Sequence, residues 1–259
     1  MKVPVFLFFV ASLTMAGLPA RSRDDKVNSP AHPAVLVELF TSEGCSDCPP
    51  ADAFLQKLDQ QPISTEQLIV LSEHVEYWNH DGWTDPYSSH TLTERQDAYG
   101  QHFHLASVYT PQMIVDGTEQ FVGNNGKQAE KVLLTAATAM KVPVQIKGAA
   151  LDGSVIHAHI DAAPLPDHAK KSDVMFAVAL NHAESQVSNG ENAGRHLVHV
   201  AVVRSISKVG TIDSQGAFSQ DIAIKLDKAV EASDLRVVAF IQEPGPSRVL
   251  GATLQKLAK

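Results

Sequence analysis

The sequence of 259 residues predicts an α/β domain over residues 34–140, followed by an all-β antiparallel sandwich over residues 141–259. In the first stretch, short apolar runs alternate with segments whose apolar residues recur at helical spacing. Near Lys141 the pattern of apolar residues changes from alternating strand and helix signals to strand signals. The length also exceeds that of one usual domain, so we expect two domains. After that point six runs alternate apolar and polar residues between Gly, Pro, Asn and Asp, over residues 142–148, 154–161, 173–180, 195–204, 218–226 and 235–243.

The first 33 residues are expected to lie outside both domains. Residues 1–20 combine Lys2, an apolar body and small residues near the end, which is the pattern of a secretory signal peptide. The apolar run is shorter than the roughly 20 residues that span a bilayer, so no stable membrane insertion is expected after cleavage. Residues 21–33 are polar and charged and contain proline, which predicts a disordered lead-in. The protein is therefore expected to be exported, as a periplasmic or secreted protein.

The charge of the chain limits its partners. The formal net charge is −8, with 29 acidic and 21 basic residues. Nucleic acids and anionic membranes attract basic surfaces. The composition therefore disfavours both, and no nucleic-acid partner is predicted.

Both cysteines of the chain lie between a predicted strand and a predicted helix. Residues 34–40 form a nearly continuous apolar run, which is typical of a strand buried on both faces. Helical spacing follows over residues 51–58, and two prolines just before them suit the first turn of a helix. Cys45 and Cys48 thus precede a helix N-terminus, where a thiol loses its proton more easily. We expect Cys45, the outer of the two, to be the nucleophile and Cys48 to be the resolving thiol.

The remaining elements of the first domain follow from local patterns. Thr91 and Glu94 have the spacing of a capping box at the start of a helix. Asp116-Gly117 joins two apolar runs and predicts the turn of an antiparallel hairpin. In chain order these patterns predict a strand, a helix, a hairpin and a third helix, over residues 67–75, 92–104, 108–122 and 127–140.

The order strand, Cys-x-x-Cys, helix, strand, helix, Thr-Pro, hairpin and helix resembles the thioredoxin family. The resemblance implies a cis bond between Thr110 and Pro111 beside the two thiols. It also implies that the Thr110 backbone is free to pair with an extended substrate chain. The stretch Cys45-Ser46-Asp47-Cys48 departs from thioredoxins, because it lacks their preceding Trp and central Gly-Pro.

Longer motifs narrow the resemblance. The chain is similar to secreted bacterial thioredoxin-like proteins of the domain-of-unknown-function family 1223, through the motifs ELFTSEGCSDCPPAD, HVEYWNHDGW, TERQDAY, VYTPQMIVDG and GENAGRHL. The resemblance spans nearly the whole mature chain but supplies no substrate. For the GENAGRHL segment, which the residues alone indicate as a loop between strands, it implies a contact at the domain interface.

A second candidate cluster follows the second predicted strand. Residues 72–86 contain His74 and both tryptophans of the chain, Trp78 and Trp83. Strand C-termini gather on one side of such a sheet, so His74 is expected near the thiols, where it could bind substrate or tune Cys45. The alternative is a long loop packed on its own aromatic side chains. The other histidines that alternate along predicted strands are interpreted as ordinary sheet residues: His157, His159, His196 and His199.

Together these observations predict an exported thiol–disulfide oxidoreductase. Its catalytic residues are predicted to be Cys45, Cys48 and Pro111. Its substrate-binding residues are predicted to be Thr110, His74, Trp78 and Trp83. The client would be a protein or a small molecule that carries a thiol or a disulfide, together with a redox partner that the sequence does not identify. No cofactor and no metal ligand is predicted.

Three alternatives remain open from the sequence. A structural disulfide in so small a ring would add about 2 kcal/mol at most, which favours redox chemistry over a structural role. The two thiolates with His74 could instead hold a soft ion of the copper type in a metal-handling protein. The third alternative is a non-catalytic binding module with the same fold.

Overall fold

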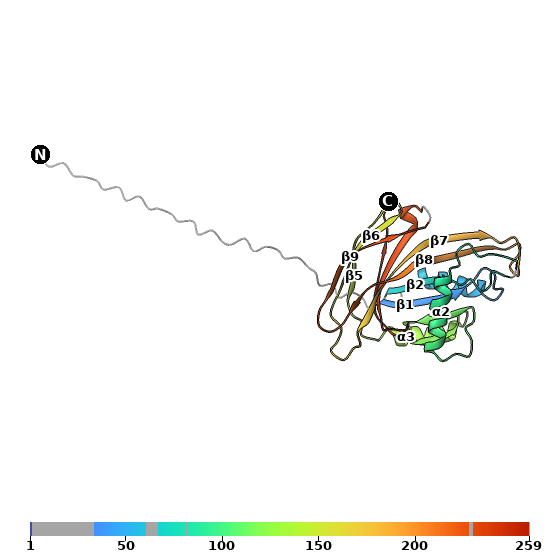
Figure 1. Ribbon diagram of the computed structural model, residues 1–259, viewed down its shortest axis with the longest axis horizontal. Helices are drawn as coiled ribbons and strands as arrows, with labels where there is room; N and C mark the ends of the chain where they lie inside the picture. The colour runs from blue at the N-terminus through green and yellow to red at the C-terminus, as the bar shows by residue number, and fades with distance from the viewer. Residues whose placement is uncertain (2–33, 61–66, 81, 228–229, 259) are drawn as a thin grey trace. The chain divides into compact units, whose positions relative to one another are not determined.

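A computed structural model describes Met1 and residues 34–60, 67–80, 82–227 and 230–258 (Figure 1). Apart from Met1, the predicted signal peptide (1–20) and lead-in (21–33) lie outside these residues. Ala31–Lys259 forms one compact unit, and the elements below belong to it.

The elements of the first half follow the predicted order, since their signals are local. The structure contains β1 (Ala34–Thr41), α1 (Pro49–Gln60), β2 (Gln67–His74), α2 (His90–His102), β3 (Gln112–Val115), β4 (Glu119–Val122) and α3 (Gly126–Ala136). The capping box is not formed, because α2 begins before Thr91 and its N-cap is Ser89, whose side chain makes no capping hydrogen bond. α3 is capped by the side chain of Asn125, which accepts a hydrogen bond from the Gln128 N–H at 3.2 Å.

The second half is almost entirely strand. It contains β5 (Val144–Asp152), β6 (Val155–Ala162), β7 (Ser172–Gln186), β8 (His196–Ile212), β9 (Phe218–Lys225), the short 3₁₀ helix η1 (Ala232–Asp234), β10 (Leu235–Gln242) and β11 (Val249–Lys256). β7 and β8 are the longest strands, with 15 and 17 residues, and they pair along nearly their whole length.

The predicted fold class, an α/β thioredoxin-like domain followed by an all-β antiparallel sandwich domain, is wrong. The described residues contain only three α-helices, and strands of both halves form one mixed sheet of eight strands in the order β11-β10-β7-β8-β2-β1-β3-β4. β2 pairs with β8 in parallel at Ser72 and Val202, so the edge of β2 is not open. Alternation of apolar and polar residues marks a strand but does not reveal which sheet the strand joins, and this is why the prediction failed.

A second sheet covers one part of the large one. It contains three strands in the order β5-β6-β9, which lie together beside β7 and β8 in Figure 1. Ile156, Ile160 and Ile222 from this sheet share one hydrophobic cluster with Phe176 of β7 and Val237 of β10. Apolar faces of the two sheets therefore bury each other.

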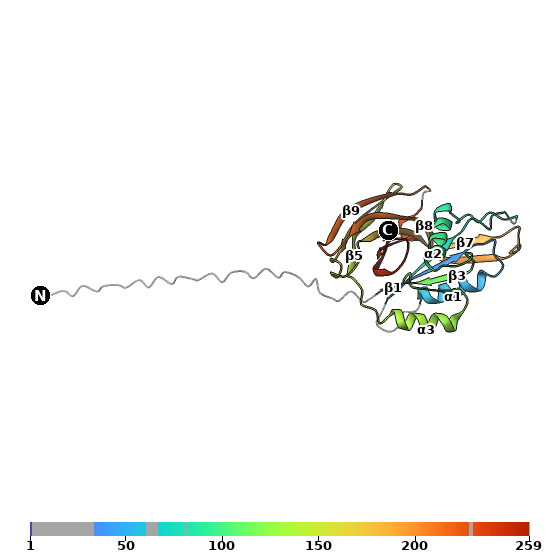
Figure 2. The ribbon, with the colours of Figure 1, turned by 60° about the horizontal axis from the view of Figure 1, so that its bottom comes forward.

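The helices cover the other part of the large sheet, on both faces. β1 is buried along its whole length, and its successive side chains point to opposite faces. Val37 and its alternate neighbours pack with residues of α1 and α3, whereas Leu36 packs on the other face with Leu92 of α2. Figure 2 shows the same division, with α1 and α3 on one side of β1 and α2 on the other. Each such buried aliphatic side chain contributes about 1.5–3 kcal/mol to the free energy of unfolding.

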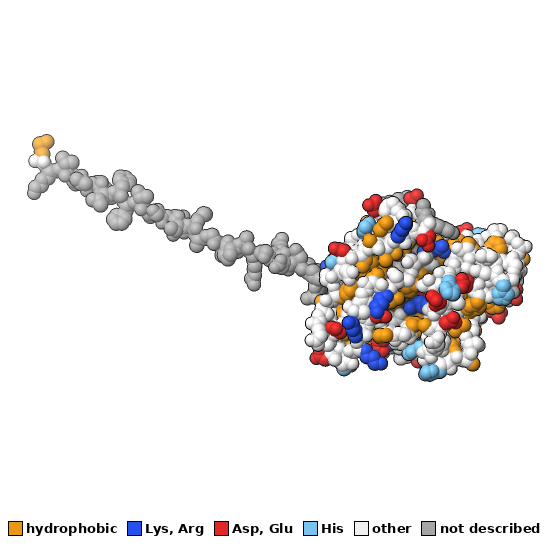
Figure 3. All heavy atoms as spheres, viewed as in Figure 1, with side chains coloured by type: hydrophobic (Ala, Val, Ile, Leu, Met, Phe, Trp, Pro, Cys, Tyr) orange, Lys and Arg blue, Asp and Glu red, His pale blue; other side chains and the backbone are white. Residues whose placement is uncertain are grey.

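The surface mixes charged and apolar side chains. Acidic and basic side chains are interspersed on the face that Figure 3 shows, with apolar side chains between them. Leu134 of α3 and Met140 just beyond it are exposed. Within the described part of the chain, no helix has both the length and the apolar composition needed to cross a membrane.

The turn between β3 and β4 yields a testable prediction about stability. Asp116 and Gly117 both have positive φ, at 47° and 64°, as the Asp-Gly signal predicts. A β-carbon at Gly117 would lie 1.9 Å from the carbonyl oxygen of Ser247, so Gly117→Ala must displace backbone. We expect Gly117→Ala to lower the free energy of unfolding by clearly more than the roughly 1–2 kcal/mol of a left-handed alanine. Urea unfolding measures the loss.

Gly153 provides the matched control for this substitution. It also follows an aspartate in a turn and has a φ of 60°, but a β-carbon there meets nothing within 4 Å. Gly153→Ala should therefore show the backbone penalty alone. Equal losses in the two variants would contradict close packing of Gly117 on Ser247.

Candidate functional site

The two cysteines lie between β1 and α1 and are joined by a disulfide bond. The carbonyl of Cys48 accepts hydrogen bonds from the N–H groups of Ala51 at 2.9 Å and Asp52 at 3.1 Å, so Cys48 precedes the first turn of α1, as predicted. Cys45 and Cys48 are only 1% and 0% exposed, although both residues between them are exposed. Cys45, which the sequence suggests as the outer thiol, is therefore as buried as Cys48.

Trp78 and Thr110 lie on one side of the cysteine loop, which is the segment of residues 42–48 between β1 and α1. The Trp78 indole N–H donates to the Thr110 hydroxyl at 2.7 Å. A β-carbon at Gly44 would lie 3.0 Å from both the β-carbon and the carbonyl oxygen of Trp78, so the loop packs tightly against Trp78. The bond between Thr110 and Pro111 is cis, as the resemblance implies. The structure thus brings Trp78, and Thr110 with it, against the cysteine loop.

Trp83 contacts Glu43, and His74 contacts Asp85, which in turn binds the backbone of Glu43. The Trp83 indole N–H donates to Glu43 Oε2 at 2.8 Å. His74 is fully buried, and its Nδ1 lies 2.7 Å from Asp85 Oδ2, which also accepts from the Glu43 N–H at 2.9 Å. Burial opposes ionisation of Asp85, but His74 and the N–H of Glu43 lower the pKa of Asp85 below its ordinary value. His74 is therefore held by Asp85 and has no exposed surface.

His199 of β8 joins this group, although the sequence suggests an ordinary sheet residue. Its Nε2 lies 3.2 Å from Glu43 Oε1, and its Nδ1 lies 3.8 Å from Asp52 Oδ2. The rings of His74 and His199 meet edge to face, with centroids 4.7 Å apart. Burial opposes the charged imidazolium, but the carboxylates of Asp52 and Glu43 outweigh it and raise the pKa of His199 to about 10. A buried imidazolium thus lies between two carboxylates that flank the cysteines in the sequence.

The tip of the hairpin between β7 and β8 touches the cysteine loop. The Asn192 side chain is fully buried and donates to the carbonyls of Glu43 at 2.8 Å and Cys45 at 2.9 Å. Glu191 accepts from the Ser46 N–H at 3.1 Å, and Ser46 lowers the pKa of Glu191. The GENAGRHL segment, expected at a domain interface, therefore lies directly on the disulfide loop.

A family model described as "Protein of unknown function (DUF1223)" matches residues 36–242. The chain belongs to this family. The membership of family 1223 that the motifs suggest is thereby confirmed. No curated protein matches the chain.

Two solved structures resemble this DUF1223 protein over most of its length. The crystal structure of a protein from Agrobacterium tumefaciens has a TM-score of 0.64 and 27% sequence identity, and the match covers 85% of this chain and 92% of that one. HBP35 of Porphyromonas gingivalis has a TM-score of 0.67 and 18% identity, with 87% of this chain and 76% of that chain covered. At that identity the second likeness shows a shared fold alone.

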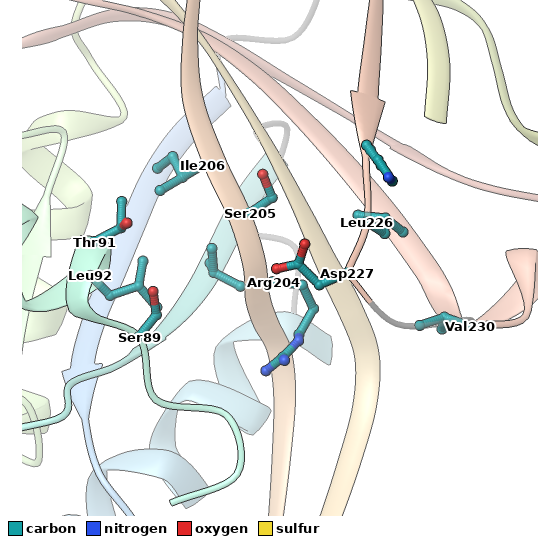
Figure 4. Close-up of a pocket in the computed structure, with 11 residues that line it drawn as sticks. Ser89, Thr91, Leu92, Arg204, Ser205, Ile206, Leu226, Asp227 and Val230 are labelled. Carbon is teal, nitrogen blue, oxygen red and sulfur yellow. The ribbon is translucent and has the colours of Figure 1, made fainter. Parts of the chain in front are cut away.

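One cavity of this DUF1223 protein adjoins the cysteine loop. It has a volume of 190 Å³ and lies between the start of α1 and the start of β8, lined by Pro49, Asp52, Ala53, Gln56, His196, Leu197, Val198 and His199. A separate cavity of 230 Å³ lies between α2 and β8 and contains none of the predicted site residues; Figure 4 shows Ser89, Thr91, Arg204 and Asp227 around it. A third cavity, of 530 Å³, lies beside α3. Of these three cavities, the first lies next to the segment that follows Cys48.

The described residues contain no group of three or more His, Cys, Asp or Glu side chains arranged to hold a metal ion. They do contain a second buried charged group, next to His74 in the sequence. Arg95 Nε donates to Glu38 Oε1 at 2.8 Å and lies 3.5 Å from Glu73 Oε2, while Tyr99 donates to Glu38 Oε2 at 2.6 Å. Burial, and then the charge of Glu38, raise the pKa of Glu73 well above its ordinary value. Both carboxyl oxygens of Glu73 are buried and lack a hydrogen-bond partner among the described residues.

Proposed function

We propose that this DUF1223 protein is an exported thiol–disulfide oxidoreductase. The observation that carries the proposal is the disulfide between two cysteines three positions apart at the N-terminus of α1. A helix N-terminus stabilises a thiolate, which makes such a bond easier to break than one in a neutral site. A ring this small contributes little to stability, so its chemistry gives the better reason for its presence.

The proposed reaction is dithiol–disulfide exchange through Cys45. A client thiolate attacks Cys45 Sγ, the bond to Cys48 breaks, and its electron pair leaves on Cys48 Sγ. A second thiol of the client then attacks the mixed disulfide and releases Cys45 as a thiolate. The client loses two electrons as its disulfide forms, the cysteine pair gains them, and each thiolate takes up a proton according to its pKa.

Access to the buried sulfurs gives the neighbouring side chains a role in this reaction. Ser46 and Asp47 are exposed, so a client can reach the loop there. The half-buried Trp78 and Thr110 offer an apolar surface and a hydrogen-bonding edge beside the loop, which suits a protein or small-molecule client. Displacement of the hairpin tip around Asn192 would then expose Cys45.

Cysteine substitutions test the proposal. In the reverse direction the Cys45 thiolate attacks a client disulfide and Cys48 resolves the mixed disulfide, so we expect Cys48→Ser to accumulate mixed disulfides on Cys45 and Cys45→Ser to accumulate few. Non-reducing gels of the exported protein, followed by mass spectrometry of the trapped species, measure both. Trapping by neither variant would overturn the exchange reaction. Equal trapping by both would contradict the assignment of Cys45 as the nucleophile and Cys48 as the resolving thiol.

Export is a separate part of the proposal. It is supported by the charged, then apolar, then small-residue pattern of residues 1–20. Cell fractionation with N-terminal sequencing should find a chain that begins after this segment and lies outside the cytoplasm. An intact chain that starts at Met1 in the cytoplasm would contradict export.

A further inference from the structure

The charged group around His199 suggests a further role at the cysteine site. Glu43 is two residues before Cys45, and Asp52 is four residues after Cys48, on the first turns of α1. His199 comes from β8, far along the chain, and is 1% exposed. One imidazole thus contacts both segments that flank the disulfide.

The backbone connects this group to the cysteines. The Asp52 N–H donates to the Cys48 carbonyl at 3.1 Å, and Asn192 links the carbonyls of Glu43 and Cys45. Pro49, which follows Cys48, lines the same 190 Å³ cavity as Asp52 and His199. Asp52 and His199 are both buried and therefore lie beside the backbone of the segment that carries Cys48, where charges interact more strongly than in bulk water.

Two polar atoms of this group lack hydrogen-bond partners among the described residues. They are Asp52 Oδ1 and His199 Nδ1. Unpaired buried polar atoms are costly and uncommon, and they are frequent where function sets the arrangement. Two such atoms thus belong to side chains that contact both segments flanking the disulfide.

We propose that His199 is a positioning residue for the exchange reaction: its cation, held between Glu43 and Asp52, stabilises the thiolates of Cys45 and Cys48. This inference rests on the proposed function and adds a residue that sets the redox potential of the same site. The groups that face His199 are Glu43 from the cysteine loop, Asp52 from α1, His74 from β2 and Tyr87 from the following loop, the last with ring centroids 6.0 Å apart. Removal of the cation leaves Glu43 and Asp52 to oppose thiolate formation.

Two variants, one that removes a positive charge and one that removes a negative charge, test the inference. In His199→Asn we expect a higher thiolate pKa and an equilibrium with dithiothreitol shifted about tenfold toward the disulfide, which is about 30 mV. In Asp52→Asn, which removes one anion while Glu43 still pairs with His199, we expect shifts of both quantities in the other direction. The thiolate absorbance of the reduced full-length protein, followed against pH, gives the pKa, and equilibration in dithiothreitol mixtures gives the potential.

His196→Asn is the matched control. His196 lies on the same strand and lines the same cavity, but its ring is 3.1 Å from Glu184 and about half exposed, so it should leave both quantities unchanged. Circular dichroism of the oxidised variants checks folding, and loss of structure cannot produce shifts of opposite sign. Shifts of the same sign in His199→Asn and Asp52→Asn, or none in either, would overturn the inference. Neither readout uses a client protein, so both can fail while Cys48→Ser still traps clients, or hold while it traps none.

Discussion

Replacement of Arg95 by methionine is expected to lower the free energy of unfolding by about 3–5 kcal/mol, since it leaves the buried Glu38 carboxylate without its counter-charge. Arg95 is held by Glu38, lies 3.1 Å from Gln242 Oε1 and lies against the Tyr99 ring. Methionine fills a similar volume, so the loss reports the charge more than a cavity. Urea unfolding at neutral pH measures it.

Arg204→Met serves as the control for this substitution. Arg204 also lies over a tyrosine ring, that of Tyr87, and donates to the Tyr87 carbonyl at 3.4 Å, but it is only partly buried and has no carboxylate partner among the ion pairs of the described residues. We expect a loss below about 1 kcal/mol there, as for most surface changes. A comparable loss in both variants would mean that the contact of the arginine with a tyrosine ring, and not its pairing with a carboxylate, accounts for the effect.

Glu73→Gln is expected to remove a loss of stability that the wild-type protein shows as the pH rises. The folded-state pKa of Glu73 is raised above its ordinary value of 4.5, so the unfolded state releases this proton first as the pH rises. Stability from this group is therefore complete below pH 4.5 and is lost as the pH rises through the folded-state pKa. Glutamine stays neutral, so the variant should gain on the wild type by up to about 1.4 kcal/mol per pH unit in that window.

The measurement for Glu73→Gln is urea unfolding of both proteins at a series of pH values from 4 upward. Differences due to all other groups cancel in the comparison. Glu130→Gln changes an exposed carboxylate on α3 and should show no such divergence. Parallel stability curves for Glu73→Gln and the wild type would mean that Glu73 is ionised in the folded state.

Much of the local structure could be predicted because its causes are local. The apolar run before the cysteines, the two prolines and the Asp116-Gly117 turn identify β1, the start of α1 and the β3–β4 hairpin. The fold class could not be predicted in the same way. It depends on β8 pairing with β2 across 130 positions, from Ser72 to Val202, and no local pattern encodes that pairing.

The residues of the candidate site also fall into two groups: those that local patterns identify and those that only the fold brings together. Cys45, Cys48 and Trp78 were identifiable by residue type and spacing, and the structure places all three at one loop. His199 and Asn192 reach Glu43 across separations of 156 and 149 positions. His199 alternates along a strand like its neighbours, and Asn192 belongs to a loop that resembles any other turn. Only the fold reveals that both contact the cysteine segment.

The single sheet also constrains the order in which the chain can fold. Asp59 of α1 pairs with Arg236 of β10, with Nη2 and Oδ2 3.0 Å apart, and the Val249 N–H donates to the Asp116 carbonyl at 2.8 Å. During synthesis the segment up to residue 140 therefore emerges long before its partners in β8, β10 and β11 exist. Contacts of such sequence separation slow folding, because a long loop must close before they form. The cysteine loop should consequently acquire its final surroundings only after the β7–β8 hairpin has left the ribosome, and a chain cut before β10 would carry the cysteines without the partner of Asp59.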